Sequence, residues 1–192
     1  MEERIKQILA QREINRITDP GLTPAAVLAP LYDKEGEWHI LFTKRTHLVA
    51  DHKGQISFPG GKREKSDCDF LSTALREAWE EIGLEPALVN VLGELDNEKT
   101  ISNFVIHPFL AIVPHPYDFL LSSAEVEALV EFPISVLLDK ANFREDTVIH
   151  AGEKNPAYYY SYGDQVIWGA TARILKKLLD LTGIYLLDQK TP

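Results

Sequence analysis

Residues 58–84 read FPGGKREKSDCDFLSTALREAWEEIGL and hold the strongest pattern in the chain. A Pro-Gly-Gly turn at residues 59–61 leads into a segment with helical periodicity. At about 100° per residue, one stripe of that segment is apolar and consists of Leu71, Leu75, Ala78 and Ile82. The opposite side carries Glu77, Glu80 and Glu81. The sequence therefore predicts a helix with one face against the core and a carboxylate patch on the other.

The three glutamates need a positive partner, because like charges at these spacings repel by about a few tenths of a kcal/mol per pair. Arg76 lies one turn before Glu80 and can pair with it, which leaves Glu77 and Glu81 with no cation of their own. Mg²⁺ takes oxygen ligands, and glycines such as those at residues 60–61 let the backbone approach a ligand closely. An isolated pattern of this kind is usually a solvated helix face. The glycine turn beside it favours a divalent cation site.

These residues resemble the Nudix box, the signature of hydrolases that cleave a nucleoside diphosphate linked to another moiety. The matching residues are Gly61, Arg76, Glu77, Glu80, Glu81, Gly83 and Leu84. The acidic residue six positions after Gly61 is Asp67 instead of a glutamate, and eight residues instead of seven separate it from Arg76. Counting back from Arg76 places Lys62 and Cys68 at the glycine and glutamate positions. The loop thus carries one extra residue, and the sequence leaves the role of Asp67 open.

Two further segments resemble one branch of this family, the coenzyme A pyrophosphatases. Residues 41–45 (LFTKR) and 52–61 (HKGQISFPGG) are similar to the extra motif of that branch, although Ala50 stands where many members have arginine. Residues 167–173 (IWGATAR) also look like the branch. The resemblance covers most of residues 25–180. It implies cleavage of coenzyme A, or of its derivatives, to 3′,5′-ADP and 4′-phosphopantetheine.

The resemblance also implies a fold, a cofactor and a set of site residues. The expected fold is the Nudix-type α/β/α sandwich with a mixed sheet, and the expected cofactor is Mg²⁺ or Mn²⁺. The implied metal ligands and catalytic groups are Glu77, Glu80 and Glu81, one of which accepts a proton from the attacking water. Arg76 orients a glutamate, and a backbone carbonyl of the glycine pair, assigned to Gly60, completes the coordination. The expected substrate contacts are Arg45, Lys53, Gly54, Gly60, Gly61 and Lys62.

Local charge supports an anionic substrate beside the glutamates. Residues 44–65 contain six basic and two acidic side chains, a local balance of +4, whereas the whole chain has a formal net charge of −9. The overall charge argues against nucleic acid or an anionic membrane as the partner. Two alternatives stay open. One is a Nudix hydrolase of ADP-ribose, NADH or another nucleoside diphosphate derivative, including a nucleoside triphosphate, and the other is a catalytically silent Nudix-fold binding module.

The chain's 192 residues suit one domain of ordinary size, which we place at residues 25–186 after a helical extension at residues 1–24. Cys68 is the single cysteine, so no disulfide can form within the chain. The first residues do not read as a secretory signal, and no apolar run approaches the ~20 residues that span a bilayer. We expect a cytoplasmic enzyme, with a homodimer as the default assembly.

The remaining elements follow from periodicity and from turn residues. We expect a helix over residues 1–18 and a polar loop over residues 96–103. The expected strands are residues 25–32, 38–46, 55–58, 88–95, 104–113 and 127–132. A short helix is expected at residues 134–138 and a second long helix over residues 168–181. The tyrosines of residues 158–162 favour a hairpin with one buried face, and the alternative is that their rings stack on an adenine. Glu125 and Glu127 could each add a ligand to the metal site, although a surface role is the favoured reading for both.

Overall fold

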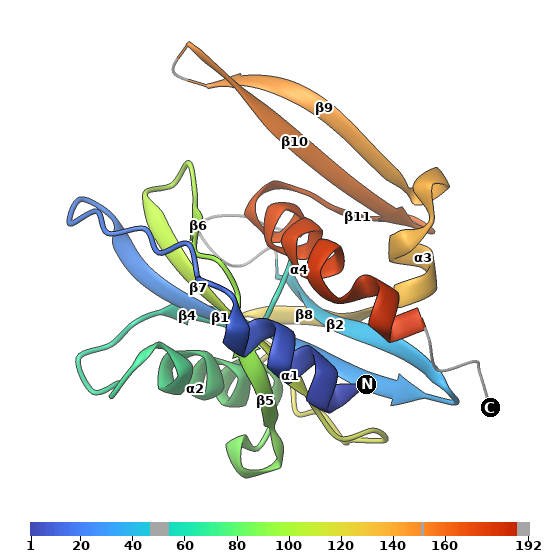
Figure 1. Ribbon diagram of the computed structural model, residues 1–192. Coiled ribbons are helices and arrows are strands. Elements are labelled where there is room, and N and C mark those ends of the chain that lie inside the picture. The colour runs from blue at the N-terminus through green and yellow to red at the C-terminus, as the bar shows by residue number, and fades with distance from the viewer. Residues whose placement is uncertain (47–53, 151, 188–192) are drawn as a thin grey trace.

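The main sheet of the computed structural model, which describes residues 1–46, 54–150 and 152–187, is drawn in Figure 1. Within the described residues it has eight strands, with the order β3-β2-β1-β7-β5 along its main path. β4 also pairs with β1, β6 with β7 and β8 with β2. The strand bounds are β1 (Thr23–Lys34), β2 (Glu37–Arg45), β3 (Ile56–Ser57), β4 (Gly60–Lys62), β5 (Asn90–Glu94), β6 (Glu98–Lys99), β7 (Phe104–Ile112) and β8 (Val126–Pro133).

The sheet is mixed because β1 and β7 run parallel, in register from the Thr23–Phe104 pair to the Leu31–Ile112 pair, whereas the other pairings are antiparallel. β1 is central, and its apolar residues are buried on both faces of the sheet. This explains why the strand reads as a nearly continuous apolar run. β1 also carries β4, which holds the glycine pair, along its edge.

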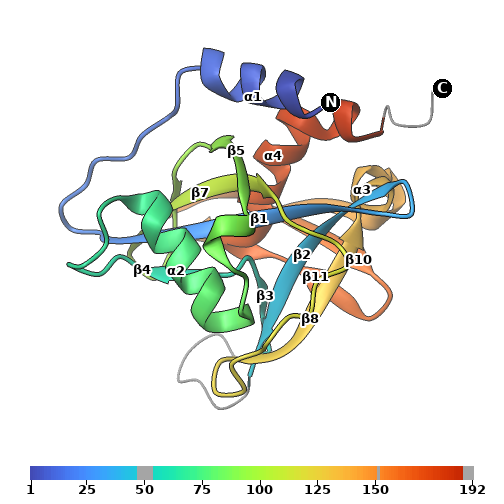
Figure 2. The ribbon, with the colours of Figure 1, turned by 90° about the horizontal axis from the view of Figure 1, so that it is seen from below.

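Helices cover both faces of this sheet. α2 (Phe70–Ile82) packs Ala74, Ala78 and Ile82 against one face, where they meet Ala26 and Leu28 of β1. The opposite face is covered by α1 (Glu2–Gln11), α3 (Ile134–Leu138) and α4 (Gly169–Leu187). Figure 2 shows α2 and α1 on opposite sides of the sheet. The predicted α/β/α sandwich with a mixed sheet is confirmed.

A second sheet of three strands, β9 (Phe143–His150), β10 (Glu153–Tyr162) and β11 (Gln165–Ile167), lies beside α4. The β9–β10 hairpin projects from the body of the molecule in Figure 1. It contains the predicted tyrosine hairpin, in which Tyr160 is buried and Tyr162 is exposed. Two 3₁₀ turns, η1 (Pro86–Leu88) and η2 (Lys140–Asn142), complete the described elements. No helix among the described residues is long and apolar enough to cross a membrane.

Four predictions about elements are wrong in detail. The first helix ends at Gln11 instead of residue 18, because the next residues bind the β5–β6 connection. There Arg12 pairs with Asp96, and Arg16 pairs with Glu94. The predicted loop at residues 96–103 contains the two-residue strand β6, and the predicted glycine turn forms β4. The last helix continues to Leu187, six residues beyond its expected end.

Candidate active site

Caps at both ends fix α2, the helix that carries the glutamates. At its start the side chain of Asp69 accepts a hydrogen bond from the Ser72 amide (2.7 Å), and the Ser72 hydroxyl accepts one from the Asp69 amide (2.9 Å). At its end Gly83 adopts a left-handed conformation with φ of 67°. Because Ala78 and Ile82 are fully buried in the core, the rotation of the helix is set, and Glu77 and Glu81 are turned toward β4.

The glycine pair is required by close packing on both sides of β4. A Cβ atom at Gly60 would overlap the carbonyl oxygen of Ala26, and one at Gly61 would overlap the carboxylate of Glu77. Only residues without a side chain allow β1 and Glu77 to approach this backbone. The Pro-Gly-Gly segment therefore places its peptide groups directly against a carboxylate of the neighbouring helix.

Glu81 is buried, with 4% of its surface exposed, although the sequence placed it on the helix face opposite the apolar stripe. Its Oε2 atom accepts a hydrogen bond from the Gly60 amide at 3.3 Å. Burial raises the pKa of Glu81 to about 8, an effect that the Gly60 amide and the charge of Arg45 offset only in part. A cation bound beside this carboxylate would favour its charged form.

Glu77 differs from the expectation that it has no cation partner. Its Oε1 atom lies 2.9 Å from Nη1 of Arg76, yet burial still raises its pKa above the usual value for glutamate. The charge of Glu125, which precedes β8, contributes to the raised pKa values of both Glu77 and Glu81. The sequence favoured a surface role for Glu125, since nothing in its local pattern indicates that the start of β8 lies near α2.

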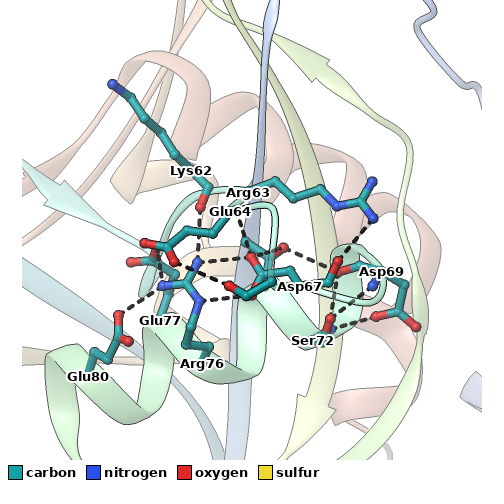
Figure 3. Close-up of polar contacts among 11 residues, drawn as sticks. Lys62, Arg63, Glu64, Asp67, Asp69, Ser72, Arg76, Glu77 and Glu80 are labelled. Carbon is teal, nitrogen blue, oxygen red and sulfur yellow. Dashed lines mark hydrogen bonds and ion pairs between the residues drawn. The ribbon is translucent and has the colours of Figure 1, made fainter.

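Arg76 is the centre of a network that Figure 3 shows. Its Nη1 atom donates to Glu77 and to Glu80 at 2.9 Å each, and its Nη2 atom donates to the carbonyl oxygen of Lys62 at 3.0 Å. The predicted pairing of Arg76 with Glu80 is confirmed. The side chain of Glu80 is 54% exposed, so it lies at the rim of the carboxylate cluster, unlike the buried Glu81.

Asp67 completes the fixation of Arg76, which answers the question that the sequence left open. Its two carboxylate oxygens accept hydrogen bonds from Nε (2.9 Å) and Nη2 (3.0 Å) of Arg76. The Glu64 amide and the Thr73 hydroxyl donate to the same carboxylate at 2.8 and 2.9 Å. The Arg76 guanidinium, with these two donors, holds the pKa of Asp67 well below its usual range. The extra loop residue thus lets the aspartate, which is shorter than a glutamate, form a bidentate ion pair with Arg76.

The expected substrate contacts lie in several places. The Nε atom of Arg45, at the end of β2, is buried and has no hydrogen-bond partner among the described residues. Gly54 donates its amide to the Arg45 carbonyl at 3.1 Å, so both residues lie at this end of β2. Lys62 points away from Arg76 in Figure 3 and holds its ammonium 5.5 Å from the centre of the Phe104 ring. Lys53 lies outside the described residues.

The donor set at this site suits a hard divalent cation. Glu77 and Glu81 are carboxylates whose pKa values are raised by burial, and Gly60 adds a nearby peptide group. Among the described residues, no three His, Cys, Asp or Glu side chains already surround one ion position. Glu77 and Glu80 each lie 2.9 Å from Nη1 of Arg76. Glu77 and Glu81 would hold the ion together with water and substrate oxygens, and Glu80 stays a predicted further ligand.

Known proteins are similar to this chain over most of its length. The family model of the NUDIX domain matches residues 22–151. A relative from Yersinia pestis, an uncharacterised Nudix hydrolase called NudL, is 34% identical over 160 residues, which cover 83% of this chain and 80% of the relative. The same identity and coverage are found for NudL of Yersinia pseudotuberculosis.

Two solved structures share the fold. A MutT/nudix family protein from Enterococcus faecalis has a TM-score of 0.59 at 16% identity, over 94% of this chain and 68% of that one. A binary complex of the Ap4A hydrolase from C. elegans has a TM-score of 0.51 at 18% identity, over 58% of this chain and 80% of that one. At these identities the likeness concerns the fold alone.

Proposed function

The chain belongs to the Nudix hydrolase family, and we propose that it cleaves the diphosphate of coenzyme A or its derivatives with the help of Mg²⁺ or Mn²⁺. The observation that supports this most directly is the pair of carboxylates, the buried Glu81 and the half-buried Glu77, held against the Gly60–Gly61 backbone. Members of this family generally use divalent metal ions. The choice of coenzyme A is supported by the sequence motifs at residues 41–61 and 167–173.

Each residue of the site has a distinct task in the proposed reaction. Glu77 and Glu81 would hold the ion, with Glu80 as a further ligand and the backbone of Gly60 beside them. An ion held there would screen the diphosphate charge and lower the pKa of a coordinated water. A glutamate of the cluster accepts the proton of the attacking water. Water then adds across the P–O–P linkage, one P–O bond breaks, and the products are 3′,5′-ADP and 4′-phosphopantetheine.

Arg76 and the basic segment assist without forming bonds to the reacting phosphorus. Arg76 holds Glu77 and Glu80 in place, since its own guanidinium is fixed by Asp67. Arg45, whose Nε atom is buried without a hydrogen-bond partner among the described residues, places a positive charge near Glu81, where it attracts an anionic substrate. The other proposed substrate contacts are Lys53, Gly54, Gly60, Gly61 and Lys62.

The decisive test compares the wild type with Glu81→Gln in a Mg²⁺-dependent assay of coenzyme A, an acyl-coenzyme A and ADP-ribose. We expect coenzyme A or its acyl derivative to be the best substrate. We also expect Glu81→Gln to reduce turnover by at least ~100-fold, because an isosteric amide cannot supply the lost charge to the ion. A preference for ADP-ribose would contradict the coenzyme A assignment. Equal rates for the two proteins would remove the metal site, and no turnover by the wild type would indicate a binding module.

A further inference from the structure

Arg63, the first residue after β4, spans the loop that carries the extra residue. The Nη2 atom of its guanidinium donates to the carbonyl oxygens of Asp67 (3.2 Å) and Cys68 (3.1 Å). The Arg63 amide donates to the carbonyl of Pro24 at 3.0 Å, which ties the start of the loop to β1. Figure 3 shows the side chain lying along the loop toward Asp67. Arg63 therefore connects both ends of the segment from residue 63 to residue 68.

The same guanidinium rests on a column of stacked rings. Its central carbon lies 4.7 Å from the centre of the Phe70 ring, and Phe70 stacks on His107 with ring centres 3.4 Å apart and planes 7° from parallel. His107 is buried on β7, where its Nδ1 atom lies 3.1 Å from Nδ2 of the Asn97 side chain. The loop is thereby braced against the central sheet through a cation–π contact and a ring stack.

The loop matters because it determines where Asp67 holds Arg76. Asp67 lies at the far end of the loop, and the Glu64 amide within the loop donates to its carboxylate. Asp67 fixes Arg76, and Arg76 fixes Glu77 and Glu80. We propose that Arg63 is a positioning residue of the metal site, acting on the glutamates through the loop, Asp67 and Arg76. This inference rests on the metal-binding part of the proposed function.

An arginine is needed for this task. Its planar guanidinium can lie flat on the Phe70 ring while one nitrogen donates to two carbonyl oxygens, whereas the ammonium of lysine is a point charge without that geometry. Arg63→Lys retains the positive charge and removes the planar guanidinium. The variant therefore separates the effect of local charge on the site from the effect of loop geometry.

The test measures Mn²⁺ binding to the metal-free protein by calorimetry, alongside steady-state kinetics with coenzyme A. We expect Arg63→Ala to weaken Mn²⁺ binding by roughly 10-fold, as for groups that orient metal ligands, and to lower kcat with KM changed less than about twofold. Arg63→Lys should recover only part of the loss. The matched control is Lys65→Ala, which removes one positive charge from an exposed position in the same loop and should bind Mn²⁺ like the wild type.

Three results would overturn the assignment. They are wild-type Mn²⁺ affinity in Arg63→Ala, an equal loss in Lys65→Ala, and a raised KM with unchanged kcat, which would mean that Arg63 contacts the substrate. Thermal melting checks that each variant is folded, and if Arg63→Ala does not fold, Arg63→Lys carries the same comparison. Mn²⁺ binding needs no turnover. A wild type that fails to cleave coenzyme A would therefore refute the proposed reaction without deciding the role of Arg63.

Discussion

At the scale of single residues, the glycines of β4 determine how closely the glutamates of α2 approach the backbone. At Gly61 the missing side chain lets the Glu77 carboxylate lie against β4, and Glu81 lies deeper, beneath the Gly60 amide. Two carboxylates held in this way cost free energy unless a cation joins them. Glu77 and Glu81 therefore destabilise the protein when no ion is bound and favour the binding of a metal ion.

A methyl group at Gly61 should displace Glu77 and reduce activity. We expect Gly61→Ala to lower kcat/KM by about 100-fold, the size of effect expected when a catalytic group moves by about 1 Å. Gly21→Ala is the matched control, because the nearest atom to its new Cβ is the tip of the Asp19 side chain. Steady-state kinetics of both variants measure the loss of activity, and melting curves check that both are folded. Full activity in Gly61→Ala would show that the approach of Glu77 to this backbone is not needed.

His107 offers a test of how the stability of the fold depends on pH. Burial lowers its pKa below the usual 6.5, and this effect outweighs the nearby Glu94, whose Oε1 atom lies 3.3 Å from Nδ1. A group whose pKa is lower when folded contributes stability above its unfolded pKa and loses it as the pH falls through the folded value. We therefore expect stability to decrease as the pH falls below about 6.5.

Two measurements check this expectation. Titration by NMR should give a pKa for His107 below 6.5, and His107→Gln should lose less stability than the wild type between pH 7.5 and pH 5. The glutamine keeps polar atoms near Asn97 but has no ring to titrate. A pKa above 6.5 would mean that pairing with Glu94 dominates, and the sign of the pH dependence would then be reversed.

At the scale of elements, α1 is packed into the fold although it precedes the matched domain. Ile5 and Leu9 are buried in the core beside α4, and a Cβ atom at Gly93 of β5 would lie 2.8 Å from that of Leu9. The following segment is fixed by the Arg12–Asp96 and Arg16–Glu94 pairs. The division at residue 24 stays a proposal, and we regard residues 1–24 as an extension that packs on the domain at residues 25–186.

Truncation of Leu9 measures how strongly α1 is attached. Leu9→Ala should destabilise the protein by about 2–5 kcal/mol in urea unfolding, the usual range for a leucine removed from a core. Gln7→Ala, at an exposed position of the same helix, should stay within about 0.5 kcal/mol of the wild type. If both variants unfold like the wild type, α1 is a dispensable appendage.

Much of the architecture was predictable, because the signals were local. The stripe of Leu71, Leu75, Ala78 and Ile82 placed α2, and apolar runs placed β1, β2 and β7. The end of α1 was not predictable, since ion pairs to residues more than 70 positions away determine it. β6 is too short to carry a pattern, and it forms by pairing with β7.

The same division applies to the candidate site. The helix glutamates and the glycine pair could be found from spacing. The burial of Glu81, the approach of Glu125 and the contacts of Asp67 depend on how distant segments pack, so spacing alone did not reveal them. Arg63 was visible only as one of six basic residues near the glycines. Its partners Phe70 and His107 belong to different elements.

At the scale of the whole molecule, the proposed function requires an α/β/α sandwich to bring α2 and β4 together. β1 provides the link, because it pairs with β4 along its edge and packs α2 on one face. The charge is also divided, with a basic segment near the glycines in a chain of net charge −9. A homodimer and a cytoplasmic location stay predictions that the fold itself does not address.

The most direct test is a crystal structure with Mn²⁺, using the anomalous signal of manganese to locate the ion. We predict one peak bonded to carboxylate oxygens of Glu77 and Glu81 beside Gly60, with metal–oxygen distances of about 2.0–2.2 Å, close to those of Mg²⁺. A peak elsewhere, or Glu77 and Glu81 turned apart with no ion between them at saturating Mn²⁺, would contradict the metal site on which the proposed reaction depends.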